Sequence, residues 1–230
     1  MKPRLKMDGL LLALVVVVSL GVYFSPNFFY AQSKADDFLD FFGLLLILSG
    51  SFIRMSARGH KVACSPKGWG LAQDGLYAYT RNPMYLGTFT IGIGFTILFW
   101  PWWAALIFTV LFYLRFRPLV AKEEKYLTEI FKQEYENYCN RVPRFFPSVL
   151  NVFKIKLAYE CPWHELWQTK ESRTIWTLPL IVFIAEMIKE WVLYRGRPSL
   201  STFLPLILAL IVFGIVLAFE YYLKNGKNPK

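Results

Sequence analysis

Long apolar blocks separated by short polar breaks make up most of this chain. Six blocks are candidates for helices that cross a bilayer, at residues 10–30, 38–53, 84–99, 104–119, 175–194 and 202–222. The first is close to the roughly 20 apolar residues that a membrane-spanning helix needs. The pattern therefore predicts an all-α, multi-span integral membrane protein with about six transmembrane helices.

The first block follows Lys2, Arg4 and Lys6, as the apolar part of a secretory signal peptide would. It is long enough to span a bilayer, however, and no cleavage site of the small-x-small type follows it. We expect it to be a retained transmembrane helix.

A hairpin is expected between the third and fourth blocks. Pro101 separates them, and Trp100, Trp102 and Trp103 are aromatic residues of the kind that lie at a membrane interface. A tight turn would bring the other ends of both helices to the same face of the membrane.

The polar region after the fourth block begins with a predicted cytosolic amphipathic helix. Glu123 and Glu124 lie early in it, where carboxylates favour the positive end of the helix dipole. The helix should end before Pro143. Four apolar residues recur at helical spacing and should pack on the membrane domain: Leu127, Phe131, Tyr135 and Tyr138. A second amphipathic stretch, residues 149–167, is expected to lie in the interface.

The composition supports a membrane protein and excludes a disordered chain. The 230 residues are 55% hydrophobic and 18% charged, with a net charge of +10 and a mean hydropathy of +0.36. Of the 26 Lys and Arg residues, 22 lie on one side if the N-terminus is cytoplasmic, with Lys34, Arg195 and Arg197 on the other side and Lys189 within a span. Because positive charge marks cytoplasmic loops, we expect both termini in the cytoplasm. No basic cluster indicates a nucleic-acid partner.

The cysteines indicate neither a disulfide framework nor a metal site. They are three in number and scattered. His60 with Cys64, and Cys161 with His164, would supply enough zinc ligands, but their spacing is not that of a zinc finger. We expect no metal.

Two polar segments combine charges that could bind a ligand. One is residues 75–87, directly before the third block, and the other holds Glu123 and Glu124. A tight hairpin would bring Arg81 close to these carboxylates. A guanidinium and a carboxylate at a bilayer surface can bind a zwitterionic head, such as an amino acid moiety. Alone, Arg81 would read as an ordinary cytoplasmic anchor.

The motifs in these segments resemble a known family. The chain reads G-x-Y-x-Y-x-R-N-P-M-Y-L-G from Gly75, E-E-x-x-L from Glu123 and E-Y-x-x-Y-x-x-x-V-P-R-F-x-P from Glu134. Their order and spacing resemble the integral-membrane methyltransferases that include isoprenylcysteine carboxyl methyltransferase and phospholipid N-methyltransferase. The resemblance covers about residues 38–147.

The resemblance implies S-adenosylmethionine bound at the cytoplasmic face and a methyl acceptor that enters from the membrane. That acceptor could be a prenylated-cysteine carboxylate, a phospholipid amine or a thiol. Arg81, Glu123 and Glu124 would be the catalytic residues. The cofactor-binding residues would be Tyr77, Arg81, Asn82, Pro83, Tyr85, Gly87, Glu123, Glu124, Tyr135, Tyr138, Arg141 and Arg144. Many relatives have His in place of Asn82, and Asn cannot titrate near neutral pH, so a general base is not expected there.

The apolar pattern, together with the resemblance over residues 38–147, divides the chain into four parts. Residues 1–37 would hold an N-terminal transmembrane helix and outer loop, and residues 38–147 the methyltransferase core. Residues 148–174 would be the interfacial segment, and residues 175–230 two C-terminal transmembrane helices.

Two alternative functions remain open at this point. Membrane sterol reductases, which use NADPH, carry a similar R-H/N-x-x-Y-x-G segment and a Y-C-x-x-V-P ending, which matches Tyr138 to Pro143 here. A non-catalytic lipid-binding protein could also keep the fold, although it would have no need for charges at the bilayer surface.

Overall fold

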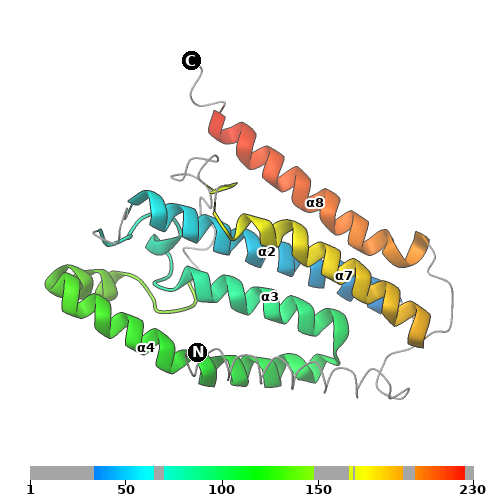
Figure 1. Cartoon of the computed structure of the whole chain (residues 1–230), viewed down its shortest axis with the longest axis horizontal. Coiled ribbons are helices and arrows are strands. Elements are labelled where there is room, and N and C mark those ends of the chain that lie inside the picture. Colours follow the sequence, from blue (N-terminus) through cyan, green and yellow to red (C-terminus); the bar gives the residue numbers. More distant parts are fainter. Residues whose placement is uncertain (1–33, 65–69, 148–165, 168, 194–199, 226–230) are drawn as a thin grey trace.

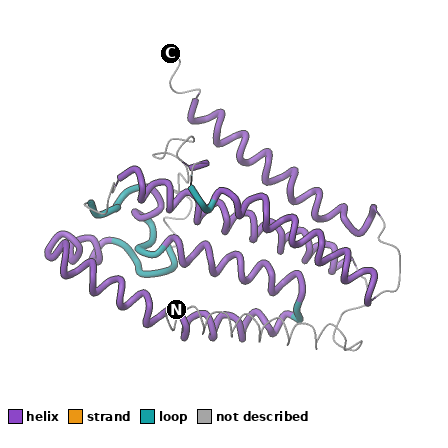
Figure 2. The backbone as a smooth tube through the Cα atoms, in the orientation of Figure 1, coloured by secondary structure: helices purple, strands orange, loops and turns teal. Residues whose placement is uncertain are grey.

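The described part of the chain is entirely helical. The computed structural model describes residues 34–64, 70–147, 166–167, 169–193 and 200–225, and no strand occurs among them (Figures 1 and 2). Its elements, in chain order, are α2 (Lys34–Cys64), the 3-10 turn η2 (Gly75–Ala78), α3 (Pro83–Phe99), α4 (Trp102–Arg141), α7 (Ser172–Leu193) and α8 (Leu200–Asn225). The expected helix at 10–30 and nearly all of the stretch at 149–167 lie outside the described residues.

The all-helical class is confirmed, and two helices are long and apolar enough to cross a membrane. These are Phe38–Cys64 within α2 and Trp102–Arg141, which is α4; Pro83–Phe99 and Leu206–Ile215 are shorter apolar helices. The second block was expected to end at residue 53, but α2 continues to Cys64, since 54–64 contains no proline and the helix tolerates its one glycine, Gly59. The count of six spans stays a prediction.

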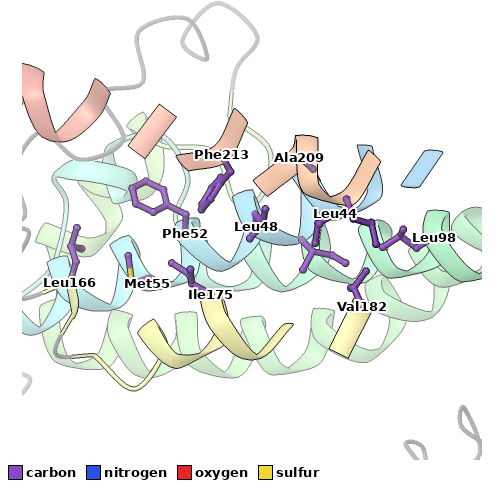
Figure 3. Close-up of a cluster of buried hydrophobic side chains, with 12 residues drawn as sticks. Leu44, Leu48, Phe52, Met55, Leu98, Leu166, Ile175, Val182, Ala209 and Phe213 are labelled. Atoms are coloured by element: carbon purple, nitrogen blue, oxygen red, sulfur yellow. The ribbon is translucent and has the colours of Figure 1, made fainter. Parts of the chain in front are cut away.

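The long helices lie roughly side by side, with α2 at the centre (Figure 1). Helix α2 packs against α3, α7 and α8, and α3 packs against α4. The largest buried apolar cluster gathers around α2, and Phe52 meets Phe213 of α8 edge to face at 6.3 Å (Figure 3). The C-terminal helices α7 and α8 therefore build this core together with α2, while α4 packs on α3.

Glycines bring α2 and α3 into close contact. A Cβ on Gly87 would lie 2.7 Å from the Gly50 carbonyl oxygen, and one on Gly94 would lie 2.6 Å from that of Gly43. Small residues allow helix backbones to approach in this way in membranes. Gly87 therefore packs one helix on another, and the cofactor contact expected for it stays a prediction.

The hairpin between α3 and α4 is tight, since α3 ends at Phe99 and α4 begins at Trp102. The Ala104 amide donates to the Pro101 carbonyl oxygen at 2.9 Å. The open ends of the hairpin, where Arg81 precedes α3 and Glu124 lies well along α4, consequently meet.

Helix α4 is not one straight helix. Lys132 has φ 47° and ψ −122°, a left-handed conformation that kinks the helix. Leu127 and Phe131 precede the kink, whereas Tyr135 and Tyr138 follow it, yet all four share one apolar cluster. The helix ends at Arg141, before Pro143. The apolar spacing thus identifies residues that meet, although they meet across a bend.

Candidate functional site

The loop before α3 begins at Gly75, where a side chain would be strained by the backbone conformation and crowded by a neighbouring residue. Gly75 has φ 57°, and a Cβ there would lie 3.2 Å from the Nδ1 atom of buried His60. The chain then passes through η2 to Asn82, which caps α3, and Pro83 occupies the first turn. Pro83 is buried and begins the helix, so its position is explained without a ligand.

Glu124 is the centre of the polar cluster. Its Oε1 lies 3.3 Å from Arg81 Nη1, and its Oε2 lies 2.6 Å from Arg144 Nη2. Arg144 Nε also donates to Oε1 at 3.1 Å, which makes that pair bidentate. The side chains of Arg81 and Glu124 are each 18% exposed. One carboxylate thus joins two guanidiniums, and the cluster keeps a net positive charge.

Arg81 is held at both its backbone and its side chain. Its amide donates to the Pro143 carbonyl oxygen at 2.9 Å, and its Nη1 donates to Cys139 Sγ at 3.0 Å. Its buried Nε has no hydrogen-bond partner among the described residues. The Nε–H group of Arg81 is therefore available to a further acceptor.

Glu123 faces a different neighbour from Glu124. The Tyr85 hydroxyl donates to Glu123 Oε1 at 2.9 Å across the α3–α4 hairpin, and the Tyr85 ring packs against Phe116 at 5.3 Å. The two adjacent glutamates consequently tie α4 to α3 and to the preceding loop, respectively.

Tyr77, Tyr135 and Tyr138 belong to the buried interior of this region. The Tyr138 hydroxyl donates to the Tyr77 carbonyl oxygen at 2.7 Å, and the Tyr77 ring stacks on His60 at 6.2 Å. Burial raises the pKa of Tyr138 well above its ordinary value, so its hydroxyl stays protonated and can donate. These tyrosines fix the loop against the second part of α4.

Arg141 makes its contacts away from Glu124. Its Nη2 donates to Gln73 Oε1 at 3.1 Å, and Gln73 Nε2 donates to Glu134 Oε1 at 2.7 Å, all on exposed side chains. The structure therefore brings together Arg81, Glu124 and Arg144, while Arg141 joins an exposed polar chain.

Thr80 is a residue of this region that the sequence reasoning missed. Its hydroxyl donates to the Phe145 carbonyl oxygen at 2.7 Å, beside the contact of Asn82 Nδ2 with the Arg144 carbonyl oxygen at 2.9 Å. Its only signal in the sequence is its position next to Arg81.

No group of three or more His, Cys, Asp or Glu residues suited to a metal ion occurs within the described ranges. His60 Nε2 lies 3.4 Å from Cys64 Sγ. The other two residues of the possible zinc set, Cys161 and His164, fall outside those ranges.

Comparison with known proteins confirms the resemblance to membrane methyltransferases. The model of a phospholipid methyltransferase family matches residues 38–134. Protein-S-isoprenylcysteine O-methyltransferases are similar: that of Schizosaccharomyces pombe is 34% identical over 79 residues, covering 34% of each chain. That of Saccharomyces cerevisiae is 31% identical over 128 residues, covering 52% of this chain and 54% of the relative. That of Mus musculus is 28% identical over 152 residues, covering 62% and 53%.

This chain thus spans between about a third and just over half the length of those three relatives. No solved structure matches it significantly.

Proposed function

We propose that this protein transfers a methyl group from S-adenosylmethionine to a prenylated, membrane-associated acceptor. The observation that carries the proposal is the cluster of Arg81, Glu124 and Arg144, in which three separate motifs of the family meet. The names of the relatives support methyl transfer and a prenylated acceptor.

The cluster fits the amino acid head of the cofactor. A zwitterionic head needs an anion for its ammonium and a cation for its carboxylate, and both lie within 3.3 Å of each other here. Glu124 suits the ammonium, while Arg144 and the spare Arg81 Nε suit the carboxylate. Two guanidiniums beside one carboxylate leave the positive charge that a carboxylate ligand prefers.

When bound, S-adenosylmethionine supplies an electrophilic methyl group on its sulfonium. The residues of this chain then have to hold the two reactants in line and exclude water. A prenylcysteine carboxylate is already ionised at neutral pH, so no residue has to remove a proton. This agrees with Asn82, whose amide cannot act as a base. Glu123, which accepts a hydrogen bond from Tyr85, would help to position the methyl donor.

The apolar part of the acceptor would lie along the aromatic side chains next to the cluster. The ring centroids of Phe89 in α3 and Phe112 in α4 lie 5.2 Å apart. The Phe146 ring lies 5.9 Å from that of Phe89, and the Phe145 ring lies 6.5 Å from that of Phe112. Phe146 is largely exposed. A prenyl chain entering from the membrane between α3 and α4 would contact these rings before its carboxylate reached the methyl donor.

The proposed orientation has both termini and the cluster on the cytoplasmic side. The distribution of Lys and Arg supports it, because cytoplasmic loops carry positive charge. Prenylated proteins present their carboxyl ends at that face, which is where the acceptor is needed.

A transfer assay tests this function. The purified protein in lipid nanodiscs is incubated with S-adenosylmethionine labelled on its methyl group and with a short peptide ending in S-farnesylcysteine. We expect label in a base-labile methyl ester, and none when the terminal carboxylate is blocked as an amide. Label in phospholipid, or in the amide-blocked peptide, would contradict a carboxylate acceptor. No transfer to any acceptor would contradict the proposal as a whole.

A further inference from the structure

The segment that carries Arg144 is attached by hydrogen bonds to three successive residues of the loop before α3. We call residues 142–147 the strap. The Arg81 backbone amide donates to the Pro143 carbonyl oxygen at 2.9 Å. Asn82 Nδ2 donates to the Arg144 carbonyl oxygen, and the Thr80 hydroxyl lies 2.7 Å from the Phe145 carbonyl oxygen and 3.5 Å from that of Arg144. Three successive residues of the loop thus hold three successive residues of the strap, about sixty positions away in sequence.

Thr80 and Asn82 are buried against the strap. Their exposed fractions are 2% and 8%. The Thr80 hydroxyl accepts a hydrogen bond from the backbone amide of Asn82 at 3.3 Å while it donates to the strap, which links the two residues. The hydrogen bonds that the Thr80 and Asn82 side chains donate both go to the strap.

The attachment fixes the backbone from which Arg144 reaches Glu124. Asn82 holds the carbonyl group of Arg144 itself, and Thr80 holds that of the next residue. A bidentate pair requires both atoms of the guanidinium edge to be placed together, and Arg144 is the more exposed partner at 41%. A displacement of the strap backbone would therefore separate this pair first.

We propose that Thr80 and Asn82 are positioning residues that act through Arg144. They hold the strap so that Arg144 is preorganised for the carboxylate of the cofactor's amino acid head. This rests on the proposed function, and it replaces the cofactor contact expected for Asn82 with an indirect role.

The first test compares two ligands in the full-length protein. S-adenosylhomocysteine carries the amino acid head, whereas 5′-methylthioadenosine shares the nucleoside and the thioether but lacks that head. We expect Thr80→Val to weaken S-adenosylhomocysteine about threefold to tenfold, the effect of one lost hydrogen bond, and to leave 5′-methylthioadenosine unchanged. Thr80→Ser, which keeps the hydroxyl, should bind like the wild type. Asn82→Ala should behave like Thr80→Val.

Thr90→Val is the matched control, because the Thr90 hydroxyl bonds within α3 to the Leu86 carbonyl oxygen. A double-mutant cycle then identifies the route of the effect. In the Arg144→Ala background, Thr80→Val should weaken S-adenosylhomocysteine by less than a further twofold. Independent, multiplying effects of the two substitutions would overturn the proposal, as would an equal loss of both ligands.

Hydrogen exchange of the strap separates this proposal from the proposed function. Backbone amides in residues 142–147 should exchange faster in Thr80→Val than in the wild type, Thr80→Ser or Thr90→Val. Unchanged exchange in Thr80→Val would overturn the attachment. If the wild type bound neither ligand, the proposed function would fail, and the exchange result would still decide whether Thr80 holds the strap.

Discussion

At the scale of single residues, the site depends on one carboxylate that two arginines share. Glu124 contacts Arg81 and Arg144 through both of its oxygens, and it is mostly shielded from water. A charge-assisted hydrogen bond in such a place is stronger than one on an open surface. Removing the charge of Glu124 should therefore affect ligand binding more than removing any nearby neutral group.

Glu124→Gln tests this directly, since it keeps the shape of the side chain and removes its charge. We expect the affinity for S-adenosylhomocysteine to fall roughly 10-fold to 100-fold, which corresponds to about 1.5–3 kcal/mol for a charged hydrogen bond. Isothermal titration calorimetry measures the change. Glu129→Gln, at an exposed position on the same helix, serves as the control and should bind like the wild type. Equal affinities in both variants would mean that Glu124 does not contact the ligand.

Sequence reasoning identified the charged residues of the site but not the roles of their neighbours. Arg81 and Glu124 could be paired because a tight hairpin joins their positions. The resemblance implies cofactor contacts for Gly87 and Asn82, which stay predictions, but it does not indicate their contacts with Gly50 and with the strap. Close approach of two helices and attachment of a distant segment depend on three-dimensional packing, which the local pattern of residues does not encode.

At the scale of helices, the contact of α2 with α3 sets where the loop before α3 lies. Gly50 and Gly87 meet backbone to backbone, and Gly87 lies in α3, six residues after Arg81. A side chain at Gly87 would push the first turn of α3 from α2. The glycines thus support the site through packing.

Gly87→Ala should consequently lower stability, because the added Cβ would lie 2.7 Å from both Gly50 O and Arg54 Cγ. Overpacking of this kind costs about 1–3 kcal/mol. Thermal unfolding in detergent, followed by intrinsic tryptophan fluorescence, should show a lower Tm. Gly214→Ala provides the comparison, since nothing lies within 4 Å of a Cβ there and Ala favours a helix by about 0.5–1 kcal/mol. A Tm for Gly87→Ala at or above that of the wild type would refute the packing role.

The kink in α4 at Lys132 is the second feature at this scale. The sequence pattern shows no break there, because Lys is a good helix former and neither Gly nor Pro lies nearby. The steric cost of the positive φ at Lys132 is offset by apolar packing, because the kink lets Leu127, before it, and Tyr138, after it, join one apolar cluster. Tertiary packing here outweighs local helix preference.

Lys132→Gly should therefore stabilise the protein by about 1 kcal/mol, since glycine adopts this conformation without steric cost. Lys125→Gly, in the regular part of the same helix, should instead destabilise by about 1 kcal/mol. Chemical or thermal denaturation of the two variants in the same detergent compares them. Similar losses of stability in both would show that Lys132 is ordinary helix in solution.

At the scale of the whole molecule, the elements fall into two groups, one that builds the apolar core and one that supplies the polar cluster. Helices α7 and α8 pack on α2 and contribute to the main apolar core, while the loop before α3, helix α4 and the strap supply the polar cluster (Figures 1 and 3). The family match at residues 38–134 includes Arg81 and Glu124, and Arg144 lies beyond it.

The cluster of Arg81, Glu124 and Arg144 is proposed to bind S-adenosylmethionine rather than a nicotinamide cofactor. Equilibrium binding of S-adenosylmethionine and of NADPH, measured in parallel on the wild type and on Arg81→Ala, tests it most directly. We predict that the wild type binds S-adenosylmethionine and not NADPH, and that Arg81→Ala inserts and purifies normally but binds at least about tenfold more weakly. Binding of NADPH alone, or unchanged affinity in Arg81→Ala, would contradict the account.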